Sequence, residues 1–84
     1  MLENINNIKG LEIYAPNGIF VGVVDEVIID IPGMEVKGLF VADANPALVD
    51  ENVSVSIPMR WVQSIGDVIL LYRFPNERIG PGSA

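Results

Sequence analysis

The sequence contains no histidine, no cysteine and no threonine. It therefore lacks a histidine-based catalytic triad, a thiol or threonine nucleophile, and the imidazole and thiolate ligands of most transition-metal sites. The absence of cysteine also excludes disulfides, so no covalent cross-link stabilises this chain of 84 residues. The groups left for chemistry are carboxylates, two lysines, two tyrosines and four serines. This repertoire favours a binding protein over an enzyme.

Basic side chains are scarce. The sequence has 5 of them against 11 acidic ones, which gives a net charge of −6. This is the wrong sign for a protein that binds nucleic acid by neutralising phosphates, so direct nucleic-acid binding is not expected. A basic protein partner fits the charge, because acidic surface attracts and orients such partners.

Long apolar runs are also missing. The densest stretch, residues 19–31, is interrupted by Gly22, Asp25 and Glu26, and no segment reaches the ~20 consecutive apolar residues of a membrane span. The first ten residues contain no apolar run typical of a signal peptide. We therefore expect a cytoplasmic protein with no membrane span.

The sequence does contain runs rich in Val, Ile, Phe and Tyr, separated by turn residues. Such runs predict strands, which we place at about 11–14, 19–31, 36–42, 53–57 and 68–74. Helical signals are limited to two short turns, within 45–49 and 59–65. Short strands with tight turns and almost no helix predict an all-β fold, either a small barrel or a closed sandwich.

The longest run, residues 19–31, alternates in polarity. Its apolar odd positions are predicted to face the core, and they are Ile19, Val21, Val23, Val27, Ile29 and Ile31. Asp25 is the lone polar residue on that face. A β-bulge near Asp25 and Glu26 would let so long a strand bend and pass from one sheet to another.

Two glycines and one short strand have structural interpretations. Gly18 is predicted to occupy a turn that needs a positive φ, and Gly22 to allow a close backbone approach within a strand. In the run 53–57 the apolar residues are predicted to point inward and the two serines outward. These are roles in the fold and indicate no ligand.

Acidic side chains are the remaining candidates for catalysis or metal binding. Asp25, Glu26 and Asp30 lie along one predicted strand, where solvated or turn-capping roles explain them better than acid–base catalysis. The acidic segment 43–51 lacks the ordered ligand spacing of an EF-hand calcium loop. We therefore predict no catalytic residues, no metal site and no cofactor.

Several short sequence motifs occur in a characteristic order. Gly10 precedes the first predicted strand, and it is followed by "NGIFVGVVDEVIID", by "VKGLFV", and by "IP" with "VQSIGDVILL" after it. This ordered set resembles the PRC-barrel family, found in the photosynthetic reaction-centre H subunit, in the ribosome-maturation factor RimM and in stand-alone archaeal proteins. The resemblance implies a small PRC-type β-barrel of about five or six strands with short helical turns. We expect a lead-in at 1–9, the barrel domain at 10–74 and a flexible tail at 75–84.

A narrower resemblance comes from "NPALV" and "IPMRWVQSIGDVILL". These segments are similar to those of single-domain archaeal PRC-barrel proteins, in which the usual sequence of the second segment is Ile-Pro-Tyr-Arg-Trp-Val. In this chain Met59 replaces the tyrosine, so its hydroxyl is absent. Members of that group are implicated in cell division as partners of SepF, the anchor of FtsZ. The resemblance implies a non-catalytic adaptor that binds a SepF-like anchor at the division site. The alternative is a RimM-like accessory role in ribosome maturation through a basic ribosomal protein.

Trp61 and Arg60 have two interpretations. In the first, Trp61 plugs the barrel and Arg60 lies along apolar surface with its head in water. In the second, both contact a protein partner together with the loop residues Asn45, Pro46 and Leu48, because Trp and Arg dominate interface energetics. The two roles are compatible.

A chain this short has a small core, and half of its residues are hydrophobic. We therefore expect the apolar side chains on the outer strand faces to be buried against a second copy of the chain. Five residues are predicted to form this homodimer interface, namely Phe20, Val24, Phe40, Ile69 and Leu71.

Overall fold

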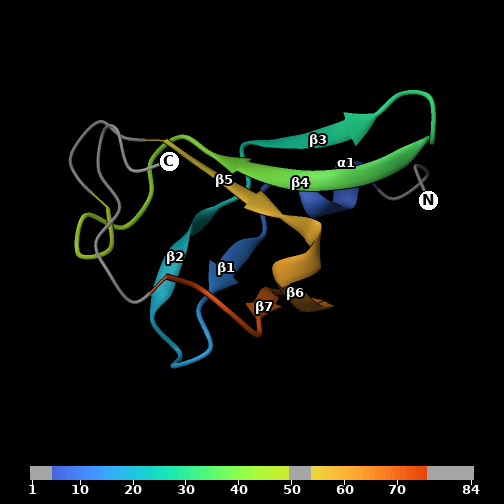
Figure 1. The fold of residues 1–84 in the computed structure, drawn as a ribbon. Helices are drawn as coiled ribbons and strands as arrows, with labels where there is room; N and C mark the ends of the chain where they lie inside the picture. Colours follow the sequence, from blue (N-terminus) through green and yellow to red (C-terminus); the bar gives the residue numbers. More distant parts are fainter. Residues whose placement is uncertain (1–4, 50–53, 76–84) are drawn as a thin grey trace.

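The computed structural model describes residues 5–49 and 54–75. Over these residues the chain forms seven strands, one short helix and one 3-10 turn (Figure 1). In chain order they are α1 (Ile5–Ile8), β1 (Glu12–Tyr14), β2 (Phe20–Val23), β3 (Glu26–Asp30), β4 (Glu35–Val41), β5 (Val55–Pro58), η1 (Met59–Trp61), β6 (Val62–Ile65) and β7 (Ile69–Leu71). The predicted all-β barrel-like class is confirmed.

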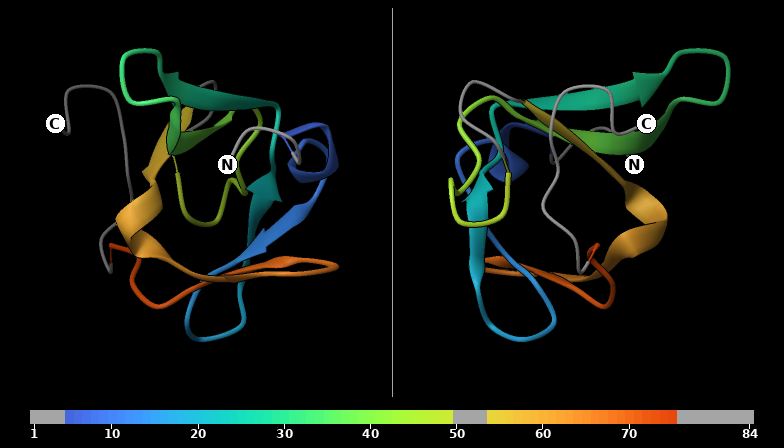
Figure 2. Two further views of the ribbon diagram at one scale, coloured as in Figure 1. Left: turned by 90° about the vertical axis from the view of Figure 1, so that its right-hand side faces the viewer. Right: turned by 60° about the vertical axis from the view of Figure 1, so that its left-hand side comes forward.

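Within the described residues, the strands form two sheets. Sheet A has the order β2-β1-β7-β6, and sheet B has the order β3-β4-β5. Neighbouring strands are antiparallel except β1 and β7, which are parallel. Figure 2 shows the two sheets arranged around a shared interior, with η1 joining β5 of one sheet to β6 of the other. The arrangement is a small barrel.

The predicted bend of the long run 19–31 is present. β2 ends at Val23 and belongs to sheet A, whereas β3 begins at Glu26 and belongs to sheet B. At the bend, the carboxylate of Asp25 accepts a hydrogen bond from the backbone N–H of Ala42 at 2.7 Å. Asp25 is exposed and does not lie on the core face, because its side chain turns out of the bend to reach that N–H.

The same bend overturns part of the predicted odd core face. Ile19 and Ile31 are 42% and 72% exposed, whereas Val24, at an even position, is only 2% exposed. The alternation already fails within β2, where pairing with β1 skips Val21, Val21 and Gly22 are both buried, and Val23 is exposed. The two residues between β2 and β3 interrupt it a second time. Alternation therefore cannot be followed across the whole run.

Twelve buried residues form the core, and none of the described residues buried there is polar or charged. They are Ile8, Ile13, Ala15, Val21, Val24, Leu39, Val41, Val49, Val55, Ile57, Ile69 and Leu71. The two sheets approach closely at Gly22, where an added Cβ would lie 2.6 Å from Cγ1 of Val41. Gly18 has φ +86° in the turn between β1 and β2. Both predicted glycine roles are confirmed.

The segment 59–65 differs from the prediction of a single helical turn. Only Met59–Trp61 is a 3-10 turn, and Val62–Ile65 forms β6, which pairs with β7. β6 lies at the edge of sheet A, so its polar residues Gln63 and Ser64 stay exposed and conceal the strand pattern. The barrel therefore has more strands than predicted.

Several predictions lie outside the described residues. They concern residues 1–4 of the lead-in, residues 50–53 and residues 76–84 of the predicted tail. No helix within 5–49 and 54–75 is long and apolar enough to cross a membrane.

Candidate binding surfaces

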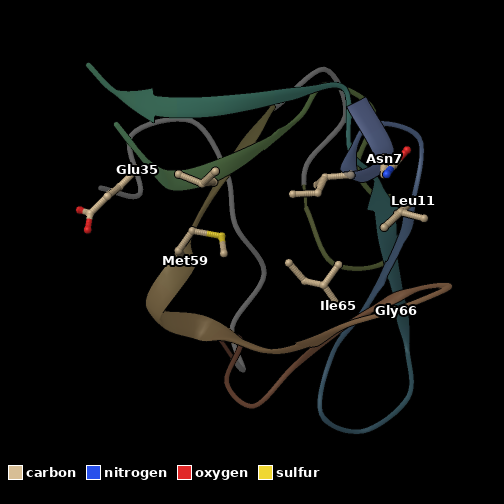
Figure 3. A pocket seen from close by; sticks show the side chains of 8 residues that line it. Asn7, Leu11, Glu35, Met59, Ile65 and Gly66 are labelled. Carbon is tan, nitrogen blue, oxygen red and sulfur yellow. The ribbon is translucent and has the colours of Figure 1, made fainter. Parts of the chain in front are cut away.

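One end of the barrel opens into an apolar pocket of about 720 Å³, here called the mouth. It is lined by Asn7 and Ile8 of α1, Leu11, Glu35 and Val36 of β4, Met59 of η1, and Ile65 and Gly66 at the end of β6. Figure 3 shows Leu11, Met59 and Ile65 directed into this space from three sides. A concave, mostly apolar site of this size suits a small ligand or an apolar side chain of a partner.

The polar groups of the mouth lie at its rim. The carboxylate of Glu35 points away from the pocket in Figure 3, and its Oε1 lies 3.7 Å from Nζ of Lys37. Both side chains of this ion pair are well exposed, so water screens it. The side chains that line the mouth are mainly apolar. The sequence prediction missed it because its lining comes from five separate segments.

Two of the predicted partner residues, Leu48 and Trp61, are linked through Phe74, a residue that was not predicted. Phe74 packs its ring against Trp61 edge to face, with the ring centroids 6.1 Å apart. Phe74 also lines a depression of about 260 Å³ together with Leu48, Pro16 and Ile19. Phe74 thus joins the loop at 45–48 to the Arg60–Trp61 pair. We call the surface formed by Pro46, Leu48, Arg60, Trp61 and Phe74 the Trp61 patch.

Asn45 holds the loop of the Trp61 patch in place. Its side-chain amide donates to the carbonyl of Phe20 at 2.7 Å, and its side-chain oxygen accepts from the N–H of Ala47 at 2.9 Å. Its backbone N–H donates to the carbonyl of Val21 at 2.8 Å. Asn45 therefore caps the N-terminus of the turn predicted within 45–49, and it ties the loop to the outer edge of β2.

Trp61 and Arg60 differ in burial, and the difference bears on the two predicted roles. Trp61 is partly buried and packs against the core, as the plug interpretation requires. The side chain of Arg60 is exposed, while its backbone carbonyl accepts a hydrogen bond from the hydroxyl of Tyr72. The backbone of this segment is therefore held by Tyr72, the residue after β7, whose N–H also donates to the carbonyl of Trp61 at 3.0 Å.

Three of the five predicted dimer residues lie in the core. Val24, Ile69 and Leu71 are 2%, 0% and 1% exposed, so the prediction that they need a partner for cover is wrong. In β7 the inward face carries Ile69 and Leu71, and Leu70 points outward, the reverse of the assumed faces. A strand apolar on both faces does not reveal which face is internal.

The outer face of sheet A nevertheless carries an apolar stripe. Tyr14 of β1 is paired with Phe20 of β2 on one side and with Leu70 of β7 on the other. The rings of Tyr14 and Phe20 contact edge to face, with centroids 5.6 Å apart. We call Tyr14, Phe20 and Leu70 the sheet A stripe. Phe40, the other predicted dimer residue, is carried by sheet B and is not part of it.

One acidic residue borders the sheet A stripe. The hydroxyl of Tyr14 donates to a carboxylate oxygen of Glu12 at 3.0 Å. This hydrogen bond raises the pKa of Tyr14 above its usual value, and the negative charge of Glu12 acts in the same direction. The tyrosine therefore stays neutral at physiological pH and contributes an aromatic contact surface.

A comparison with protein families matches residues 2–74 to the PRC-barrel domain. The chain belongs to the PRC-barrel family. The match spans both sheets, the mouth and the Trp61 patch, so these surfaces are parts of the PRC-barrel domain. A comparison with curated proteins finds no match.

The acidic side chains in the described part of this PRC barrel are dispersed. No three of its carboxylates lie close enough together to hold a metal ion. Asp25 binds the backbone of Ala42, and Glu26 lies 3.5 Å from Nζ of Lys9. Asp25 and Glu26 thus have structural partners. PRC-barrel domains are generally non-catalytic.

Proposed function

We propose that this protein is a non-catalytic adaptor that binds a protein partner through the Trp61 patch. The observation that carries the proposal is the position of Phe74, which contacts Trp61 and shares a depression with Leu48. Two segments far apart in the sequence thereby form one surface with an aromatic centre and an exposed arginine. Such a composition is typical of residues that dominate binding energy. PRC-barrel domains are protein-interaction domains, which supports this role.

The partner we propose is a SepF-like anchor of FtsZ, which makes the protein an adaptor in archaeal cell division. This identity rests on the resemblance of "NPALV" and "IPMRWV" to the single-domain archaeal proteins. The second candidate is an accessory role in ribosome maturation. The net charge of −6 favours it, because a basic ribosomal protein would be attracted to an acidic barrel.

We further propose that the protein is a homodimer that uses the sheet A stripe. Phe20 and Leu70 are exposed on neighbouring parts of one sheet, and Tyr14 lies between them. A two-fold axis through this face would bury each stripe against the other. The revised interface keeps Phe20 of the predicted set and replaces the core residues by Tyr14 and Leu70.

The partner is tested with purified proteins. The SepF-like anchor and the basic ribosomal proteins of the source organism are titrated separately against the wild type and Arg60→Glu. We expect one partner to bind the wild type and Arg60→Glu to weaken that binding at least about tenfold, since a central arginine is lost and its charge reversed. Lys37→Glu is the matched control, because it makes the same charge change at an exposed side chain of β4.

The melting temperatures of both variants should match that of the wild type, since both side chains are exposed. Equal binding by Arg60→Glu and the wild type would remove the Trp61 patch as the site. Binding of neither protein class would contradict both proposed partners.

A further inference from the structure

The four strand edges of the barrel are not equivalent. At the edge of β2, Asn45 donates to the carbonyls of Phe20 and Val21, so that edge is already occupied. β5 contains Pro58, which has no N–H to donate. β6 is bulged, because its pairing with β7 skips Gln63.

The remaining edge, β3, is regular. β3 has five residues, and within the described chain it pairs only with β4. The irregularity in that pair leaves β3 unaffected, because Lys37 of β4 is the residue skipped between Gly38 and Val36. An uninterrupted edge strand presents a row of outward N–H and C=O groups that can pair with another strand. Figure 1 shows β3 at the outer border of sheet B.

The side chains of β3 add a charge pattern to this edge. Glu26, Ile28 and Asp30 share the outer face of sheet B, and Ile28 is 40% exposed. Across the sheet, Ile28 is opposite Gly38 and Asp30 is opposite Glu35. Ile28 thus has no side chain beside it on β4, and Asp30 faces a like charge. An added strand with an apolar residue at the centre would bury Ile28, and a cation beside Asp30 would offset the repulsion.

This pattern disfavours a second copy of the chain. Antiparallel pairing of two β3 strands about Ile28 would set Glu26 of each copy opposite Asp30 of the other. Parallel pairing in register would set each acid opposite itself. Like charges directly opposite one another destabilise a strand pair. The edge therefore selects for a strand of opposite charge.

We infer that β3 is a strand-addition site for an extended segment of a basic protein, with the pattern basic–any–apolar–any–basic. The backbone of the segment pairs with the free edge of β3. Its apolar side chain covers Ile28, and its two basic side chains lie beside Glu26 and Asp30. Nζ of Lys9 already lies 3.5 Å from the carboxylate of Glu26. The ion pair between Asp30 and a basic side chain of the segment therefore contributes more to the preference for a basic segment. The site is separate from the Trp61 patch and does not depend on it.

The probe is a capped peptide of sequence Gly-Ser-Arg-Val-Ile-Val-Arg-Ser-Gly. Its central pattern reads the same in both directions, so either strand orientation places arginine beside the acids. The peptide is titrated into the full isotope-labelled chain, and amide hydrogen exchange is followed by nuclear magnetic resonance. We expect slower exchange for β3 amides that face away from β4, and an affinity that falls as salt is added.

Two control peptides separate backbone pairing from charge. Replacing both arginines with glutamate should abolish measurable binding, because like charges then face each other. Replacing both valines with proline should also abolish it, because the peptide loses backbone donors while its charge is kept. Binding of either control within about twofold of the probe would overturn the inference.

Variants of the protein locate the site. Asp30→Lys should weaken peptide binding by about fivefold or more, and Glu26→Lys by less. Asp43→Lys makes the same charge change at an exposed residue outside β3 and should leave binding within about twofold of the wild type. If Asp30→Lys fails to fold, Asp30→Asn gives the same test with a smaller loss. Protection of another strand, or equal loss in Asp43→Lys and Asp30→Lys, would contradict the site.

Discussion

The outer faces of the two sheets are built from similar strands but carry different chemistry. Sheet A presents the sheet A stripe, two aromatic rings and a leucine on three adjacent strands. Sheet B presents Glu26, Ile28 and Asp30 along an edge that no other described strand pairs with, and Glu35 lies opposite Asp30. The first face can bind by apolar burial, while the second adds charge to backbone pairing. We therefore expect binding at the sheet A stripe to be insensitive to salt and binding at β3 to weaken as salt is added.

This comparison assumes that both sheets share one core, and Gly22→Val tests the assumption. The added side chain would collide with Val41 where the sheets meet, since even a Cβ would lie 2.6 Å from its Cγ1. We expect a loss of about 3 kcal/mol in the free energy of unfolding, measured by denaturant melts. The double variant Gly22→Val with Val41→Ala should lose less than the sum of the single variants. A strictly additive result would mean that the two sheets do not press together here.

A matched pair of lysine substitutions compares the two faces directly. Phe20→Lys places a charge in the sheet A stripe and should raise the dissociation constant of the homodimer at least about tenfold, whereas Ile28→Lys on sheet B should leave it unchanged. Light scattering on a size-exclusion column, at low and high salt, distinguishes the 9.1 kDa monomer from a species of twice that mass. A wild-type monomer in both buffers would remove the dimer from the proposal.

The link between the sheets should depend on Asp25. Asp25→Ala removes the acceptor for the N–H of Ala42, and we expect a loss of about 1 kcal/mol in the free energy of unfolding. Asp25→Asn keeps an acceptor oxygen at the bend and should lose less. The denaturant midpoints of the wild type, Asp25→Ala and Asp25→Asn measure these losses. If all three agree, the hydrogen bond at 2.7 Å contributes nothing to stability.

The smallest predicted effect concerns the acid beside the sheet A stripe. Glu12→Gln removes the negative charge of the carboxylate that accepts the hydrogen bond from the hydroxyl of Tyr14. The raised pKa of Tyr14 should therefore fall toward its usual value. Because the raised pKa favours the neutral phenol in the folded state, any stability it contributes is present below the usual pKa and is lost as the pH rises through the folded value. Ultraviolet titration of the phenolate measures the shift. An unchanged curve would show that Glu12 does not perturb the stripe.

Sequence patterns predicted some parts of the barrel correctly and others not. The alternation around Val55 and Ile57 placed both side chains in the core, because β5 is apolar on one face only. The bend at Asp25 was predicted because no single strand of a small barrel can hold so long a run. In contrast, β7 is apolar on both faces, and the choice of its inward face was wrong.

The candidate site was predicted in part. Arg60, Trp61 and the loop at 45–48 stood out through residue type, but Phe74 and the mouth did not. A phenylalanine after the last strand looks like any apolar residue. Its importance comes from contacting Trp61 and lining a depression together with Leu48, and no periodicity encodes such an arrangement. The relation between Asp30 and Glu35 likewise depends on strand register.

By itself, the sequence determined the class of the protein and what it lacks: an all-β domain of the PRC-barrel type, acidic, without the side chains of most catalytic sites. The PRC-barrel type rests on the resemblance of ordered motifs to that family, whereas the other properties follow from composition and local turn chemistry, which act over a few residues. Only the tertiary structure decided which apolar residues are internal, which strand edge is free and which distant segments share a surface. The side-chain faces of β3, for example, depend on how the chain crosses between sheets at Val24 and Asp25, because a shift of one residue in the register of β3 would turn its side chains to the opposite face.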